Sequence, residues 1–425
     1  MKIIKVKQKS KEVERICARG VAPTEEIHQK VKQILEDVRK GGLSKAVEYA
    51  QKFDGLKGKS LAVSEKTIEK LADKVPETLA KGLRQAIKNA MEFHKHELKD
   101  LNGFSFKGKD GEVLGQRIRP MHRVGLYVPG GAAVYPSTVI MNAVPALVAG
   151  VDEVVVTTPA KDGIHPSVAF VLRELGITEV YHIGGAQAVA LLAYGAKGIE
   201  PVDKIVGPGN VFAAIAKKEV FGTVDIDMIA GPSEILVMAD KTADPDFVAA
   251  DLMSQAEHGS GFEAAICITD NMDMAKMISA CVDEQVENSP KRELLEKVLD
   301  HFGRILVVDN WFDGVAIANR IAPEHLEIMT CEAEELSKSI LNAGAVFIGP
   351  WSSEPVGDYF AGPDHVLPTN GTARFSSPLG VYDFVKRMSV IHYSQKAIQK
   401  HGKAIAEMAT TEGFYHHAQA VLKRL

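Results

Sequence analysis

The sequence predicts an α/β protein with two Rossmann-like parallel-sheet domains, a helical N-terminal region and a helical C-terminal tail. From residue 122 onward, short β-branched runs each end at Gly or Pro and are followed by a helical stretch of small residues. A similar series begins near residue 233. Strand, Gly-rich turn and helix in repetition are typical of a parallel sheet with helices on both faces. Residues 1–121 and 379–425 instead carry apolar side chains at the three-four spacing of amphipathic helices.

The bulk composition is that of an ordinary globular enzyme. With 425 residues, the chain has room for two or more domains with sizeable cores. The formal net charge of −5, with lysines scattered among acidic residues, argues against a nucleic-acid partner. No apolar run is long enough for a membrane span or a signal peptide. The four widely spaced cysteines suggest neither disulfides nor a cysteine metal site. We expect a cytoplasmic enzyme with no membrane partner.

The N-terminal region, residues 1–121, is expected to be mainly helical. Residues 25–42 and 67–99 carry apolar side chains at helical spacing among charged ones. We expect this region to pack with the second α/β domain.

The first α/β domain is expected over residues 122–232, with strands within 122–131, 152–160, 178–185 and 203–210. Ligands bind at the carboxyl ends of the strands in such sheets, which is where the glycines of IGGAQ and VGPGN fall. These turns would aim backbone N–H groups at a phosphate. Neither turn fits G-x-G-x-x-G, so two tight turns in an ordinary sheet explain the pattern equally well.

The second α/β domain is expected over residues 233–378 and contains a helix at 244–258. Asp244 is a good N-cap for this helix, and Gly259 is a natural terminator. Its inward stripe is expected to consist of Phe247, Val248, Leu252, Met253 and Ala256. Residues 379–425 are helical and too polar to form their own core, so they should pack on another domain or another subunit.

Gln255 and His258 lie three residues apart in QAEH, on one face of the last turn of that helix. This spacing would let both side chains bind one ion or ligand. An isolated pair of this kind is more often a helix cap beside an ordinary polar residue.

Glu324 and His325 are adjacent in IAPEHLEIMT. Pro323 should end the preceding helix and leave the pair in a loop before the strand LEIMT. A carboxylate beside an imidazole suits general acid–base catalysis, although a surface loop would explain a lone dipeptide.

Further candidates lie near the C-terminus. Asp358 and His365 fall in a stretch rich in Gly, Pro and Ser, and such loops often carry functional residues. Glu412, His416 and His417 follow in the tail. The set that could form a zinc site without sulfur ligands is Gln255, His258, Asp358 and one of the two tail histidines. Since zinc has no redox chemistry, electrons would have to leave as hydride to a separate cofactor.

The motifs QAEH, APEHLE, GDYFAGPDHVLPTNGTARFSSPLGVYDFVKR and EGFYHHA, in this order, resemble histidinol dehydrogenase. GLYVPGG, VGPGN and AGPSE fit the same family, so the resemblance covers nearly the whole chain. It implies a homodimer with shared active sites that oxidises L-histidinol to L-histidine through L-histidinal, the last step of histidine biosynthesis. It also implies NAD and Zn²⁺ as cofactors, and a tail at 379–425 that is exchanged in the dimer.

The resemblance assigns roles to individual residues. It implies Glu324 and His325 as the acid–base pair. The implied zinc ligands are Gln255, His258, Asp358 and, from the partner subunit, His417. The implied substrate contacts are Ser233, Gln255, His258, His325, Asp358, His365, Glu412 and His417. The implied NAD contacts, in the domain at 122–232, are Tyr127, Gln187 and Asn210.

Gly259 departs from the family pattern, in which an Asp often follows the QAEH histidine. This departure keeps open a zinc- and NAD-dependent dehydrogenase of another small polar alcohol. A zinc hydrolase that uses Glu324 to activate water, or a scaffold without catalysis, would leave the Gly-rich turns or the catalytic residues without a purpose.

Overall fold

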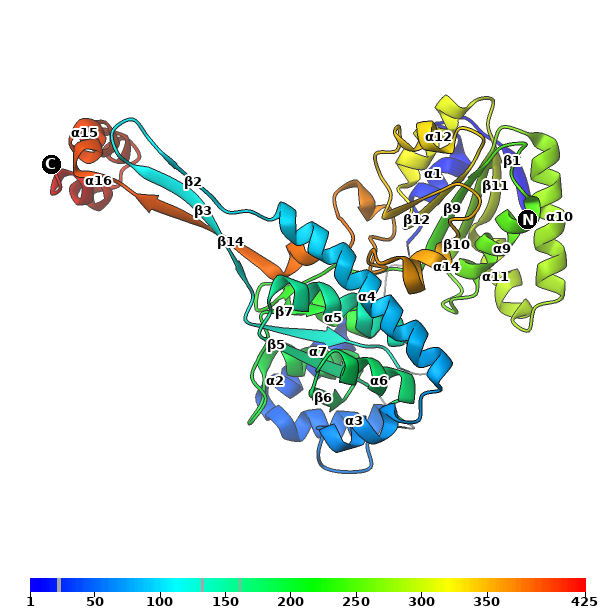
Figure 1. The fold of residues 1–425 in the computed structure, drawn as a ribbon, viewed down its shortest axis with the longest axis horizontal. Coiled ribbons are helices and arrows are strands. Elements are labelled where there is room, and N and C mark those ends of the chain that lie inside the picture. Colours follow the sequence, from blue (N-terminus) through cyan, green and yellow to red (C-terminus); the bar gives the residue numbers. More distant parts are fainter. Residues whose placement is uncertain (21–23, 131–133, 160, 162) are drawn as a thin grey trace.

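The computed structural model describes residues 1–20, 24–130, 134–159, 161 and 163–425. The predicted strand segments that end at Gly131 and Ala160 therefore extend outside the described residues. Figure 1 shows two bodies, each built around a sheet, and an arm that ends in the C-terminal helices. The prediction of an α/β protein with two parallel sheets and a helical N-terminal region is confirmed.

The first body contains a parallel sheet of five strands in the order β6-β5-β4-β7-β8. Its buried, β-branched strands are β4 (Arg123–Tyr127), β5 (Glu153–Thr158), β6 (Glu179–His182), β7 (Lys204–Val206) and β8 (Asp225–Ile226). The helices that connect them are α5 (Pro136–Ala149), α6 (Pro166–Glu174), α7 (Gly185–Tyr194) and α8 (Val211–Val220). The core lies on both faces of the sheet.

The N-terminal helices mostly cover this first body, which differs from the expectation that they pack with the second. On one face, α3 (Glu65–Ala72) and α4 (Glu77–Asp100) pack against α6 and α5. On the other face, α2 (Glu25–Phe53) packs against α7 and α8. The physical reason lies in α5 and α7, which are apolar on all sides. A helix of that kind needs a second layer over its outer face.

The second body contains a parallel sheet in the order β1-β11-β10-β9-β12-β13. Its strands are β1 (Lys2–Lys5), β9 (Glu234–Ala239), β10 (Ala264–Thr269), β11 (Gly303–Val307), β12 (His325–Met329) and β13 (Ala345–Ile348). One face is covered by α9 (Pro245–Ala256), α10 (Met272–Glu287) and α11 (Arg292–Phe302). The other is covered by α1 (Lys11–Cys17), α12 (Trp311–Ile321) and α13 (Ala333–Ser337). Within the N-terminal region, β1 and α1 thus join the second body, and α4 also contacts its residues 357–361.

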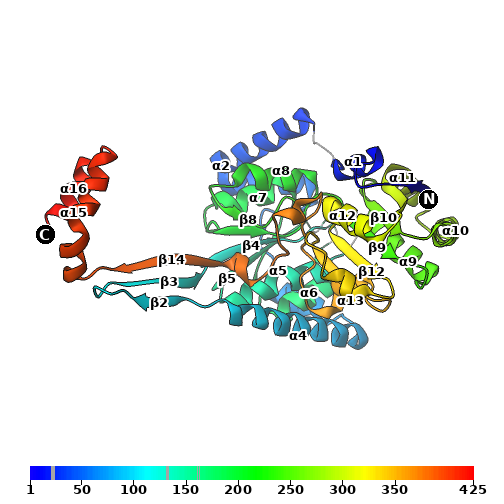
Figure 2. The same cartoon turned by 90° about the horizontal axis from the view of Figure 1, so that it is seen from above.

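The arm is a three-stranded antiparallel sheet in the order β14-β3-β2. It is formed by β2 (Phe104–Lys107), β3 (Val113–Pro120) and β14 (Val385–His392), and it carries α15 (Gln395–Thr411) and α16 (Tyr415–Leu422) at its far end. Figures 1 and 2 both show these two helices standing away from the rest of the chain. Sequence periodicity did not predict the arm, because β14 pairs with a strand that lies far away in the sequence. Among the described residues, no helix has the length and apolar character needed to cross a bilayer.

Candidate active site

Both catalytic candidates lie at the amino end of β12, next to the amino end of its neighbour β9 in the second sheet. α12 ends at Ile321, and Ala322 turns the chain with a positive φ of 47° before Pro323. Glu324 directly precedes β12, as expected. His325 was expected in the loop, but it is the first residue of β12, where parallel pairing with β9 places it opposite Ile235.

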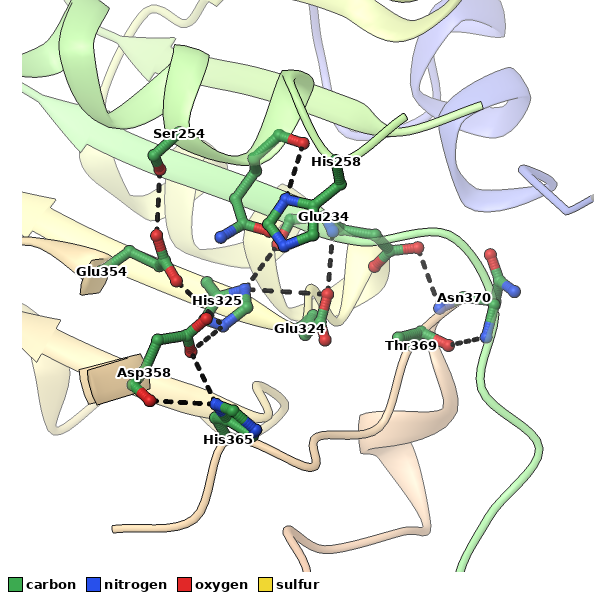
Figure 3. A network of polar contacts seen from close by, with 12 residues as sticks. Glu234, Ser254, His258, Glu324, His325, Glu354, Asp358, His365, Thr369 and Asn370 are labelled. Carbon is green, nitrogen blue, oxygen red and sulfur yellow. Dashed lines mark hydrogen bonds and ion pairs between the residues drawn. The ribbon is translucent and has the colours of Figure 1, made fainter. Parts of the chain in front are cut away.

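The backbone of Glu234 holds both catalytic side chains (Figure 3). The Glu234 N–H donates to Glu324 Oε2 at 2.9 Å, and His325 Nδ1 lies 3.0 Å from the Glu234 carbonyl oxygen. Glu324 Oε2 and His325 Nδ1 are 3.7 Å apart. Because the carbonyl can only accept, Nδ1 carries a proton, which leaves Nε2 as the ring nitrogen that can gain or lose one. The side chains of Glu324 and His325 therefore point into the same corner of the site, although neighbouring side chains in a regular strand point to opposite faces.

The surroundings of this pair shift both of its pKa values. Burial raises the pKa of Glu324 to about 8. Burial alone would lower the pKa of His325, but the nearby carboxylates of Glu324 and Asp358 outweigh it and raise that pKa to about 10. Perturbed titratable groups in one buried corner are typical of catalytic sites.

A group of metal-binding atoms lies beside His325 Nε2. Asp358 is on the π-helical turn η1 (Gly357–Ala361), which follows α14 (Glu354–Val356). Asp358 Oδ1 is 3.6 Å and Glu354 Oε1 is 4.0 Å from His325 Nε2. One ligand atom from each of these three residues lies within 4.8 Å of the others. Glu354 was missed from the sequence, although its position four residues before Asp358 places both on one side of a helical turn.

Several buried atoms in this corner lack partners among the described residues. Gln255 is fully buried, and neither its amide oxygen nor its amide nitrogen has a hydrogen-bond partner. The same is true of Glu354 Oε1 and His325 Nε2. Buried polar atoms are rarely left unpaired, and oxygen and nitrogen donors without sulfur suit a divalent ion such as zinc. The residues present therefore fit a metal ion.

Helix α9 brings Gln255 to this corner and places His258 just beyond its end. Asp244 caps α9 as expected, its side chain accepting from the Asp246 N–H at 2.9 Å. The helix ends at Ala256, so His258 follows it and is exposed, with Nδ1 3.2 Å from the Gln255 carbonyl oxygen. Phe247 does not belong to the inward stripe. It is 38% exposed and lies against Trp351, because the buried face of α9 turns toward the sheet.

The departure at Gly259 has a structural reason. Gly259 follows His258 with a φ of +104°, in a region that residues with a Cβ rarely adopt. An Asp with the same backbone would be strained, so the glycine fits the turn this chain makes here.

The predicted substrate residues fall into two groups. His365 Nδ1 lies 3.0 Å from the Asp358 carbonyl oxygen, and Ser233 directly precedes Glu234. Glu412, which directly follows α15, and His416 and His417 on α16 are exposed at the tip of the arm. Figures 1 and 2 both show that tip far from β9 and β12. One chain thus brings Gln255, His258, Glu324, His325, Asp358 and His365 into one corner, whereas the residues of its own tail lie elsewhere.

A separate cavity of about 800 Å³ lies at the carboxyl ends of the first sheet, and the three predicted cofactor residues line it. Tyr127 ends β4, Gln187 is in the first turn of α7, and Asn210 caps α8. Phe53, the last residue of α2, and Asp54, which follows it, line the same cavity. Asp54 was missed, since it lies far from the Gly-rich turns in the sequence.

The Gly-rich turns do not present the free N–H groups that the sequence suggested. The Gly184 N–H donates to Asp54 Oδ2, and the Gly185 N–H donates to the Tyr127 hydroxyl, both at 3.0 Å. Gln187 Nε2 also donates to Asp54 Oδ2 at 3.0 Å. At the other turn, the Asn210 side chain accepts from the first N–H groups of α8. Internal side chains therefore occupy the positions that a phosphate takes in a standard dinucleotide turn.

Comparisons with known proteins agree with this geometry. The model of a family described as histidinol dehydrogenase matches residues 17–425. Histidinol dehydrogenase from Bacillus subtilis (strain 168) is 49% identical over 405 residues, covering 95% of this chain and 94% of that protein. The enzyme of the same name from Geobacillus kaustophilus (strain HTA426) is 49% identical over 404 residues, covering 95% of each chain. A crystal structure of histidinol dehydrogenase from Elizabethkingia anophelis aligns with a TM-score of 0.93 at 33% identity, covering 100% of this chain and 98% of that one.

Proposed function

This chain belongs to the histidinol dehydrogenase family, and from this premise we propose that it oxidises L-histidinol to L-histidine through L-histidinal with NAD. The observation that supports this function best is the corner where Glu234 holds Glu324 and His325 beside a buried group of nitrogen and oxygen atoms without partners. An acid–base pair at a metal site is what a two-step oxidation of an alcohol requires.

The zinc ion would be held by Gln255, His258 and Asp358 of one chain and by His417 of the partner subunit. When bound, zinc would polarise and orient the alcohol and amine groups of the substrate. We do not assign His325 as a ligand, because its Nδ1 is held by the Glu234 carbonyl oxygen and its Nε2 is the atom that would exchange a proton with the substrate. Glu354 borders the same space, and its Oε2 is tied to the Ser254 hydroxyl at 3.0 Å.

The exposed position of the C-terminal tail supports an active site that is shared between two subunits. His417 and Glu412 are polar residues of an exposed tip that stands away from the body of its own chain. A second copy that receives this tip would complete the ligand set and cover the apolar side chains exposed there, Phe414 and Tyr415 among them. We therefore propose a homodimer in which residues 379–425 reach the active site of the partner.

His325 and Glu324 divide the proton transfers. In the first oxidation, His325 Nε2 accepts the hydroxyl proton while the hydride leaves the carbinol carbon. Glu324 then takes a proton from the water that adds to the aldehyde carbon, while His325 returns its proton to the aldehyde oxygen. This gives a hydrated aldehyde and leaves His325 neutral again. In the second oxidation, His325 accepts a hydroxyl proton from this hydrate as the second hydride leaves. The products are L-histidine and two NADH, with the oxygen of one water retained in the carboxylate.

The pKa of His325 suits this role only when Asp358 is compensated. The carboxylate of Asp358 helps to raise that pKa to about 10. Glu324 also contributes to this rise, but a cation held by Asp358 would offset the contribution of Asp358 and so lower the pKa of His325, toward the range in which an imidazole works well as a base.

NAD would occupy the cavity lined by Tyr127, Gln187 and Asn210. Internal hydrogen bonds already satisfy the Gly-rich turns, so the cofactor would be held by the walls of this cavity rather than by a glycine cradle. Ser233, His365 and Glu412 of the partner subunit would contact L-histidinol. The domain limits at 121, 232 and 378 and a cytoplasmic location stay predictions.

The test is NADH formation by zinc-loaded protein with L-histidinol, compared with a panel of other small amino and sulfonated alcohols. We expect L-histidinol to be preferred by at least about tenfold in kcat/KM, because a site built to pair the imidazole rejects substrates that lack it. Preference for another alcohol would show that the fold and the cofactors were assigned correctly but the substrate was not. Turnover of an ester or amide without NAD would favour the hydrolase alternative.

A further inference from the structure

We propose that Arg19, which lies outside both Rossmann-like cores, is a positioning residue for the catalytic pair. It acts through Glu234. This inference rests on the proposed function, since it concerns how Glu324 and His325 are held for that reaction.

Arg19 is buried just beyond α1 and binds Glu234 through two parallel contacts. Its Nε donates to Glu234 Oε1 at 2.7 Å and its Nη2 to Oε2 at 2.6 Å. Both side chains are only 3% exposed. A bidentate arginine–carboxylate pair fixes orientation as well as distance.

The same guanidinium also donates hydrogen bonds to the backbone of the segment that leads to the catalytic pair. Nη2 donates to the Ile321 carbonyl oxygen at 3.0 Å, and Nη1 donates to that of Ile16 at 3.1 Å. Ile321 is the last residue of α12 and lies three positions before Glu324. Arg19 therefore ties together the two segments from which the catalytic corner is built.

Glu234 transmits this constraint to the reacting groups. Its side chain is held by Arg19 and by the Asn370 N–H, which donates to Oε1 at 2.8 Å (Figure 3). Its backbone N–H and carbonyl oxygen then hold Glu324 and His325. A shift of this one residue would move both catalytic groups together and loosen the bond that keeps the His325 proton on Nδ1.

The chain offers a matched control in Arg304. This second buried arginine also pairs with a glutamate of the N-terminal region, its Nε donating to Glu12 Oε1 at 2.8 Å. Its remaining hydrogen bonds are to carbonyl oxygens near the end of α11 and the start of β11, and within the described part of the chain none of them involves Glu234, Glu324 or His325. Loss of Arg304 thus disturbs a buried ion pair without reaching the catalytic corner.

The experiment compares Arg19→Lys, Arg19→Met and Arg304→Met in the zinc-loaded protein. Steady-state rates are measured with L-histidinol and with L-histidinol deuterated at the carbinol carbon. We expect kcat to fall by about ten- to a hundredfold for Arg19→Met, because small displacements of catalytic groups cost rates of this size. The isotope effect on kcat should rise as the chemical step becomes slower, while the KM values for L-histidinol and NAD stay within about twofold. Arg19→Lys keeps the charge but not the paired geometry, so its kcat should lie between that of the wild type and that of Arg19→Met.

Arg304→Met should keep the wild-type kcat and isotope effect even if it melts at a lower temperature. A wild-type kcat and isotope effect in both Arg19 variants would overturn the inference, as would equal losses in the Arg304 variant.

A second measurement works whatever the substrate is. In ¹⁵N-histidine-labelled protein, the Nδ1 proton of His325 should exchange slowly with water in the wild type and in Arg304→Met, and faster in Arg19→Lys. Unchanged exchange in Arg19→Lys would also overturn the inference. Absence of wild-type turnover with L-histidinol would instead overturn the proposed function, and the exchange rates would still decide the role of Arg19.

Discussion

Replacement of Glu324 by Gln should separate the two oxidations and at the same time stabilise the metal-free protein. Gln keeps an oxygen that can accept the Glu234 N–H, which Glu324 Oε2 accepts at 2.9 Å, so the local geometry should survive. It cannot take a proton from water. We therefore expect the second oxidation to slow by about 10²- to 10⁴-fold, the usual contribution of a general base. The first oxidation depends on His325 and should change far less.

The stability effect follows from the pKa of the buried carboxyl. Burial raises that pKa from an ordinary 4.5 to about 8. Between these values the folded state holds a proton that the unfolded chain releases, so Glu324 destabilises the fold increasingly as the pH rises through this window. At pH 7 the cost is about 3 kcal/mol, since each pH unit above 4.5 contributes about 1.4 kcal/mol. Glu324→Gln should remove this cost, because its amide carries no charge to bury.

The assay has two parts and one matched variant. Single-turnover experiments with zinc-loaded protein give the rates of NADH formation from L-histidinol and from L-histidinal, and urea unfolding of chelator-treated protein gives the stability. Glu324→Ala leaves the buried Glu234 N–H without an acceptor, so it should lose the second oxidation without the gain in stability. Equal slowing of both oxidations by Glu324→Gln would refute the division of roles. Unfolding of that variant at a lower urea concentration than the wild type would refute the stability argument.

Three further changes have defined outcomes. His417→Ala should lower the zinc content without unfolding the chain, measured by metal analysis and circular dichroism; retained stoichiometric zinc would point to His416 or to a site within one chain. Asp54→Asn should raise the KM for NAD by about tenfold, because it weakens hydrogen bonds from Gly184 and Gln187 to a charged group; Gln51→Ala, an exposed change on the same helix, should have no such effect. The hydrogen bond from Lys400 of α15 lowers the pKa of Asp110 from 3.8 to about 2. The stabilisation of α15 by this ion pair should therefore be fully present above pH 4 and be lost as the pH falls toward 2. Asp110→Asn should already show faster amide exchange in α15 at neutral pH, and unchanged exchange would contradict the assignment of Asp110 as the residue that fixes α15.

The sequence predicted the parts of the fold that follow from local periodicity. Strand and helix patterns were sufficient for both parallel sheets, because each buried strand is a short β-branched run that ends at a turn residue. The arm and β1 were not predicted. β14 pairs with β3, and β1 with β11, across most of the chain, and nothing within a local window encodes such a partner. The packing of α2 on α7 was not predicted for a related reason: the apolar stripe of α2 shows that the helix packs on something, but it does not show which of the two bodies it packs on.

The candidate site was predictable where its residues form local patterns. Glu324 and His325 are adjacent, and Gln255 and His258 share a helical spacing, so each pair could be noticed in the sequence. The groups that hold these catalytic side chains in place could not be noticed in the sequence. Glu234 acts through its backbone, and Arg19 lies 215 positions away from it in the chain. The Gly-rich turns suggested a phosphate cradle, but Asp54, at the end of α2, accepts from the Gly184 N–H of one of them.

The most direct test of the function is to count NADH formed per L-histidinol consumed by the purified, zinc-loaded protein. We predict two NADH for each L-histidinol, with L-histidine as the product, and loss of this activity on chelation with recovery on adding zinc. One NADH per substrate with accumulated L-histidinal, or no turnover by a dimer that holds zinc, would contradict the assignment of this corner to a two-step oxidation of L-histidinol.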